Sequence, residues 1–150
     1  LAWIAFVFLA ARPPLNAFFV QHFFSWVPEN FHDEAFLAHL KDFSPSFLKI
    51  VCILFALSIT IGGMVEELYF RGYLLPRMET LGIWAPFLNV LLFSLYHFWL
   101  PWENVVRLLA LTPWVYAVWR ARNLYLSVLI HGMINAFSGI SLLLLILDRT

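Results

Sequence analysis

The sequence predicts an all-α fold: a polytopic bundle of transmembrane helices with an amphipathic interfacial helix near the N-terminus. Two features of the composition lead to this prediction. Of the 150 residues, 63% are hydrophobic and only 12% are charged, whereas soluble domains contain about 25% charged residues. Aromatic residues make up 19% of the chain, which is typical of helices that face lipid and end in aromatic belts.

The first part of the chain, residues 1–46, is predicted to be separate from the core. Residues 1–11 are apolar but too short for a bilayer span, which needs about 20 residues. We interpret them as a truncated helix end, and the chain as a fragment. The Arg-Pro-Pro sequence that follows is expected to break this helix. Residues 15–27 are then expected to form an interfacial or re-entrant piece, and residues 29–42 an amphipathic helix on the membrane surface.

The core, residues 47–147, is predicted to contain four hydrophobic helices. Ser44 is a suitable N-cap and Pro45 a suitable first-turn residue, and the helical pattern that they begin continues to Pro76. The Gly62-Gly63 pair in this helix indicates a bend or a point of close packing. Three more spans follow, at residues 82–101, 104–119 and 123–147.

A few ionisable or strongly polar side chains interrupt these apolar helices. Counted at 1.5 Å per residue from the same end of the bundle, Glu66, His97, His131 and Asn135 all lie about 12–20 Å deep. They are therefore expected to share one layer near the middle of the membrane. Because an ionisable group at this depth costs a few kcal/mol, it is expected to have a partner or a function.

The two adjacent carboxylates are predicted to have different roles. Glu66 and Glu67 point about 100° apart on a helix, so only one of them is expected to face a given cleft. Glu67 and Arg71 stand at i and i+4, in the order that favours an ion pair. This pairing leaves Glu66 as the freer carboxylate and the candidate general base. Phe93 supports His97, with which it shares a helix face.

Together these residues form a set that suits peptide hydrolysis. Glu66 and His97 could activate water and handle its proton, and His131 and Asn135 could donate hydrogen bonds to the oxyanion. The set needs no cofactor. A zinc version, with Glu66, His97 and His131 as ligands, remains an alternative because one Glu and two His form a known catalytic ligand set.

Other candidate sites are weaker. The HExxH zinc motif is absent, and His32 and His39 lie about 10 Å apart along a helix, too far to share one metal ion. Ser94 lacks the strained-turn context of a nucleophile, so we interpret it as a packing residue. Cys52 is interpreted as a buried, unreactive thiol.

Three motifs in order resemble those of the CPBP family, also called Abi. They are Glu66-Glu67-x-x-x-Arg71, Phe93-x-x-x-His97 and His131-x-x-x-Asn135, and the resemblance covers roughly residues 47–147. The family comprises CAAX proteases, including the type II CAAX prenyl endopeptidases, and bacteriocin-processing or immunity proteins. The resemblance implies a glutamate-type intramembrane endopeptidase in which Glu66 and His97 activate water while His131 and Asn135 stabilise the oxyanion.

The resemblance also indicates the localisation of the protein and its partners. It implies a multi-pass integral membrane protein, in the cell membrane if the source is prokaryotic. The expected partners are membrane lipids and a membrane-associated protein or peptide substrate. A net charge of zero gives no indication of a nucleic-acid partner. Two alternatives stay open: a non-catalytic protein, such as a bacteriocin-immunity or partner-binding factor, and a proton or ion pathway.

Overall fold

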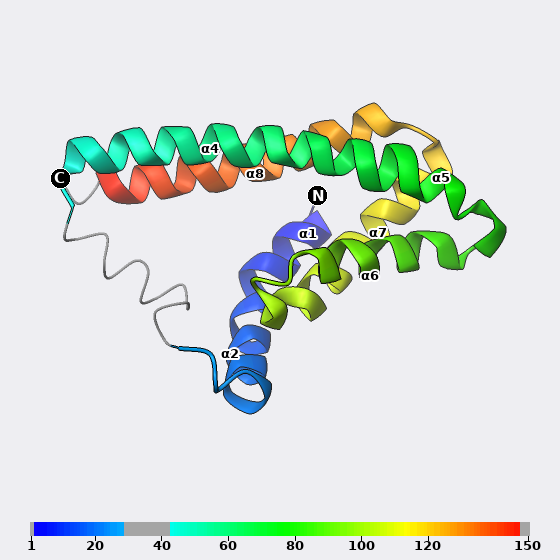
Figure 1. Cartoon of the computed structure of the whole chain (residues 1–150), viewed down its shortest axis with the longest axis horizontal. Helices are drawn as coiled ribbons and strands as arrows, with labels where there is room; N and C mark the ends of the chain where they lie inside the picture. The colour runs from blue at the N-terminus through cyan, green and yellow to red at the C-terminus, as the bar shows by residue number, and fades with distance from the viewer. Residues whose placement is uncertain (1, 29–42, 148–150) are drawn as a thin grey trace. The chain divides into compact units, whose positions relative to one another are not determined.

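The computed structural model describes residues 2–28 and 43–147, with side chains to residue 144. Within these ranges the regular secondary structure is entirely helical, as predicted (Figure 1). The chain divides into two compact units. The first unit comprises Leu1–Val27 and Leu68–Ser127, and the second comprises Pro28–Glu67 and Val128–Thr150. The predicted amphipathic helix at 29–42, with His32 and His39, lies outside the described residues.

Three helices in the described part of the chain are long and apolar enough to cross a membrane: Ala2–Phe23, Pro45–Arg77 and Leu124–Leu144. The second of these exposes many large apolar side chains, among them Phe47, Ile50, Phe55, Ile61 and Val65. Such a continuous apolar surface suits contact with lipid. The composition therefore predicted the class of protein correctly.

The N-terminal helix continues through the two prolines, so the predicted break was wrong and residues 15–23 are not a separate piece; the interfacial position of residues 15–27 stays a prediction. Helix α1 (Ala2–Phe6) passes through the π-helix η1 (Val7–Ala11) into α2 (Arg12–Phe23). The Arg12 backbone N–H donates to Val7 O, five residues back, which widens the turn just before Pro13 and Pro14. These prolines lie in the first turn of α2, where a missing N–H is tolerated.

In the second unit, α4 (Pro45–Glu67) and most of α8 (Leu124–Leu147) form an antiparallel pair (Figure 1). Helix α4 begins as predicted, because Phe47 N donates to Ser44 Oγ at 3.3 Å. Near this end of α4, Leu48 and the buried Cys52 pack against Leu142 and Leu143.

Close approach of the two helices depends on a small residue on α8. A Cβ atom at Gly139 would lie 2.5 Å from the Cβ atom of Ala56. Helices that approach this closely need small residues at the contact.

The first unit is built around helices α6 (Trp84–Tyr96) and α7 (Asn104–Ala121), which pack against each other. Short helical segments precede or connect them: η4 (Leu68–Leu74), α5 (Leu75–Arg77), η5 (Glu79–Leu81) and η6 (Pro101–Glu103). Helix α7 also contacts η1 and α2. The buried side chains include Val90, Val106, Ala110, Val115 and Val118. The buried Asn89 donates to Phe70 O at 2.8 Å and so satisfies a carbonyl of the π-helix η4.

Helix α6 is shorter than predicted. The expected span at 82–101 is a 13-residue helix that ends at Tyr96, below the length that crosses a bilayer. His97 is its C-cap, with ψ 47°. The His97 ring donates from Nδ1 to Phe93 O at 2.9 Å, while its backbone N–H bonds to Ser94 O at 3.1 Å. In a continued α-helix the backbone N–H of His97 would bond to Phe93 O. Here the His97 side chain binds that carbonyl instead.

Candidate active site

The predicted site residues are distributed over both units. The second unit holds Glu66 and Glu67 at the end of α4, and His131 and Asn135 on α8. The first unit holds Arg71 in η4, Phe93 in α6, and His97. The structure brings together the four residues of the second unit and, separately, the three of the first.

Glu67 is the direct partner of His131. Its side chain is 0% exposed, and Oε1 lies 2.8 Å from His131 Nδ1. An ionised carboxylate only accepts hydrogen bonds, so Nδ1 carries the hydrogen of this contact. The short charge-assisted bond fixes the orientation of the imidazole ring. The sequence missed this contact, since it predicted Arg71 as the partner of Glu67; that ion pair stays a prediction.

Glu66 approaches the opposite side of the same ring. Its Oε2 lies 3.8 Å from His131 Nε2, and its side chain is 20% exposed, against 12% for His131. This separation is too long for a direct hydrogen bond. Glu66 is therefore the more accessible of the two carboxylates; its role as the freer carboxylate and general base stays a prediction. The two carboxylates flank one imidazole, although only one of them was expected to face the site.

Asn135 and Gly63 complete the contact between α4 and α8. Asn135 Nδ2 donates to Ile59 O at 2.7 Å. Gly63 faces this amide: a Cβ atom there would lie 2.6 Å from Asn135 Nδ2 and 3.1 Å from His131 Cδ2. The predicted close-packing point is thus Gly63, whereas a Cβ atom at Gly62 would meet nothing within 4 Å. Ile59, Gly63 and Glu67 are spaced four residues apart, so they lie on one face of α4. This spacing was the sequence signal that could have indicated which face of α4 contacts α8.

His97 has a different environment in the first unit. Its Nδ1 donates to a backbone carbonyl, so in the neutral ring Nε2 is the basic nitrogen. Three aromatic rings surround the imidazole, with centroids at 4.6 Å (Phe93), 5.2 Å (Tyr96) and 5.0 Å (Trp99). The predicted link between Phe93 and His97 is therefore seen in both the main chain and the rings.

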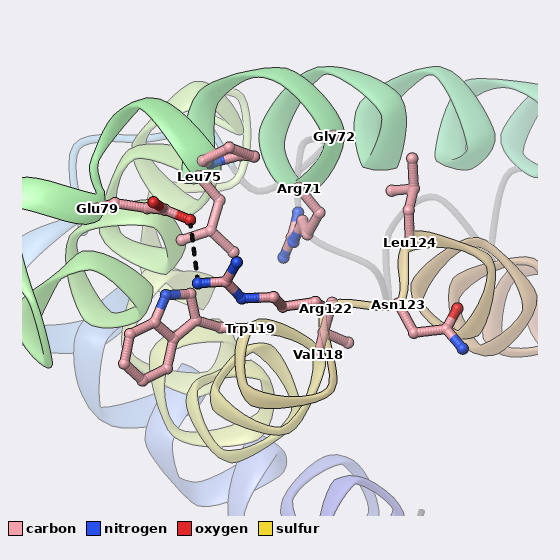
Figure 2. Close-up of a pocket in the computed structure, with 10 residues that line it drawn as sticks. Arg71, Gly72, Leu75, Glu79, Val118, Trp119, Arg122, Asn123 and Leu124 are labelled. Atoms are coloured by element: carbon pink, nitrogen blue, oxygen red, sulfur yellow. Dashed lines mark ion pairs between the residues drawn. The ribbon is translucent and has the colours of Figure 1, made fainter.

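Arg71 is buried among aromatic side chains. Its guanidinium carbon lies 4.4 Å from the ring centroid of Phe93 and 5.3 Å from that of Trp114, within the range of cation–π attraction. Arg71 also borders a cavity of about 310 Å³ at the end of α7, whose other charged residues are Glu79 and Arg122 (Figure 2). Phe93 thus contacts both Arg71 and His97.

The structure also describes the surroundings of Ser94 and of the residues that could bind a metal. Ser94 is fully buried, and its hydroxyl lies 3.1 Å from both the backbone and the side-chain oxygen of Asn104, which agrees with a packing role. Over residues 2–28 and 43–147, no three His, Cys, Asp or Glu side chains are grouped as metal ligands. The zinc set of Glu66, His97 and His131 stays a prediction.

Comparison with known proteins gives a family. The family model described as Rce1-like, "Type II CAAX prenyl endopeptidase Rce1-like", matches residues 48–137, which is more than half of the chain. The matched region includes all three predicted motifs and ends two residues after Asn135. No curated protein and no solved structure matches the chain.

Proposed function

The chain belongs to the type II CAAX prenyl endopeptidase Rce1-like family, and from this we propose that it is an intramembrane endopeptidase whose general base is Glu66. The family is a protease family, and the candidate membrane spans make the chain a membrane protein. The proposal adds the reaction type, a multi-pass topology, and a membrane-associated protein or peptide as substrate. For a prokaryotic source it adds the cell membrane.

The observation that carries the proposal is the placement of two carboxylates on opposite nitrogens of one imidazole. Glu67 holds Nδ1 at 2.8 Å, whereas Glu66 lies 3.8 Å from Nε2 and is partly exposed. The buried carboxylate suits an orienting role, and the exposed one suits contact with water. Glu66 accepts a proton from the water that attacks the scissile carbonyl.

Asn135 and His131 bind the oxyanion that forms in this attack. The Asn135 amide has two N–H groups, and one of them bonds to Ile59 O. We assign the second to the oxyanion. Glu67 holds His131 at Nδ1, and we assign its other ring nitrogen, Nε2, to the oxyanion as a donor when that nitrogen carries hydrogen. Loss of one such donor typically costs about 10²–10³-fold in rate.

We assign the later proton transfer to His97, in line with the family resemblance, which implies that it acts with Glu66 on the water. Its Nδ1 is held by Phe93 O, so Nε2 can accept a proton and pass it to the leaving amine. Phe93 packs against this ring, and Arg71 in turn lies over the Phe93 ring. The reaction as proposed uses no cofactor.

The test is cleavage by purified protein in lipid vesicles. The probes are a farnesylated CAAX peptide and an unprenylated membrane-anchored peptide of the same sequence. We expect wild type to cleave at least one of them. Glu66→Gln should reduce the rate by at least about 10²-fold, since general-base help contributes this much.

Glu79→Gln is the matched control, because it makes the same change at a carboxylate whose side chain is 56% exposed; its rate should match that of wild type. Cleavage by Glu66→Gln at the wild-type rate would remove Glu66 as the base. Activity lost on chelation and restored by zinc would favour the zinc alternative. Binding of peptide without cleavage by wild type would favour a non-catalytic role.

A further inference from the structure

The turn that carries His97 is held by a charge network that the proposed reaction does not use: Glu103 and Arg107 are buried, and the Arg12 side chain that joins them is 36% exposed. Glu103 is 6% exposed and Arg107 is 7% exposed. Glu103 Oε1 accepts from Arg12 Nε at 2.8 Å and from Asn16 Nδ2 at 3.2 Å. Its other oxygen, Oε2, lies 3.5 Å from Arg107 NH2. The network therefore joins α2 to η6 and α7 within the first unit.

Arg107 connects this network to the main chain of the turn. Arg107 NH1 donates to Leu100 O at 3.1 Å and to Asn104 Oδ1 at 3.2 Å. Leu100 N in turn donates to His97 O at 3.1 Å. A continuous series of hydrogen bonds thus leads from Arg12 on α2 to the main chain of His97.

A second route reaches the same histidine from the other side. The Asn104 side chain that Arg107 contacts also accepts from Ser94 Oγ at 3.1 Å. Ser94 O accepts the backbone N–H of His97. Both the beginning and the end of the turn are therefore fixed by the network.

Stability alone is a poor explanation for such a network. Burying charges costs several kcal/mol per ion, and replacing a buried ion network by apolar residues is often neutral or stabilising. In an apolar bundle, the default expectation for buried charges is a functional role. Apolar side chains could pack α2 against η6, but they could not fix the direction of the Leu100 and His97 carbonyls.

We propose that Arg12, Glu103 and Arg107 are positioning residues for His97, and that α2 is a working part of the enzyme although the family match begins only at residue 48. The effect on turnover rests on the proposed function. A displacement of about 1 Å in a reacting group can cost up to about 10²-fold in rate. Loosening the turn should therefore lower kcat and leave KM, which reports on substrate binding, nearly unchanged.

The test compares Arg12→Met with Arg122→Met in the full-length protein in lipid vesicles. Arg12→Met removes the ion pair to Glu103 and keeps most of the side-chain volume. Arg122→Met makes the same change at an arginine whose side chain is 82% exposed. Two quantities are measured: kcat and KM for the cleaved peptide, and amide hydrogen exchange of residues 97–103.

For Arg12→Met we expect exchange of this segment to rise about tenfold and kcat to fall about tenfold, with KM within twofold of wild type. Arg122→Met should change neither quantity. Arg12→Lys keeps the charge but has one donor group, so it should give about threefold changes. This variant also decides the question if Arg12→Met fails to fold. Unchanged exchange, or raised exchange with unchanged kcat, would overturn the proposal.

The two proposals fail in different ways. If wild type cleaves no peptide, the proposed function fails, and the exchange measurement still decides whether the network holds the turn. If wild type cleaves and Glu66→Gln does not, the proposed function stands whatever the Arg12 variants do.

Discussion

His131 in the second unit and His97 in the first show two ways of holding an imidazole in an apolar protein. Both rings have a fixed partner at Nδ1, and the bonds are similar in length, 2.8 Å and 2.9 Å. The partner of His131 is a carboxylate, whereas that of His97 is a backbone carbonyl. A carboxylate stabilises a positive ring as well as orienting it, whereas the neutral carbonyl mainly orients the ring. The proposed roles, oxyanion binding for His131 and proton transfer for His97, are consistent with this difference.

The surroundings of the two rings differ as well. His131 lies against Gly63, where even one methyl group would collide with the site. His97 lies among aromatic rings and at the end of a hydrogen-bonded turn. The first site therefore depends on close helix packing, and the second depends on how a loop is fixed.

Glu67→Ala should have the largest effect, because it tests whether His131 needs a carboxylate at Nδ1 where His97 has only a carbonyl. It removes the carboxylate from His131 Nδ1 and should lower kcat by about 10²–10⁴-fold, the range of general acid–base contributions. Glu67→Gln keeps an acceptor for Nδ1 but removes the charge, so it separates orientation from charge. If charge matters, Glu67→Gln should be nearly as slow as Glu67→Ala. A Glu67→Gln rate close to wild type would show that His131 needs only orientation, as His97 does.

Gly63→Ala tests the packing of the second unit. The new methyl group would lie 2.6 Å from Asn135 Nδ2, so either the amide must give up its bond to Ile59 O or the helices must separate. We expect the free energy of unfolding in detergent micelles to fall by about 1–3 kcal/mol and the cleavage rate to fall with it. Gly62→Ala is the control, because its methyl group meets nothing within 4 Å. It should raise stability by about 0.5–1 kcal/mol, and a loss equal to that of Gly63→Ala would contradict this packing.

Arg122→Gly should have the smallest effect. Arg122 ends α7 in the left-handed conformation, with φ 50°, which glycine adopts at little cost. Its ion pair with Glu79 spans 3.7 Å and is exposed, so losing it costs at most about 1 kcal/mol. Unfolding in micelles should show a gain of a few tenths of a kcal/mol up to about 1 kcal/mol. If the free energy of unfolding fell by more than about 1 kcal/mol, the exposed pair of Arg122 and Glu79 would contribute more to stability than its exposure predicts.

Local signals in the sequence predicted a large part of this architecture. The N-cap at Ser44, the long apolar run after it and the final apolar segment each produced a helix close to the expected bounds. The contact between Phe93 and His97 also follows from helical spacing. These features depend on residues within one or two turns of each other.

The features that sequence reasoning missed depend on non-local contacts or on competition between side chain and main chain. The continuation through Pro13 depends on a π-turn just before it. The end of α6 depends on the His97 ring, which donates to the backbone carbonyl of Phe93. The pairing of Glu67 with His131 and of Arg12 with Glu103 joins residues 64 and 91 positions apart, and no local pattern indicates such partners.

The most direct test of the central claim, that Glu66 activates water rather than attacking the peptide itself, is a single-turnover cleavage in H₂¹⁸O. Excess enzyme is mixed with substrate, and mass spectrometry follows the new C-terminus of the product and the enzyme peptide that contains Glu66. Direct attack by water predicts one ¹⁸O atom in the product and none in Glu66. Label in Glu66 with an unlabelled product would mean a covalent intermediate and would contradict the account.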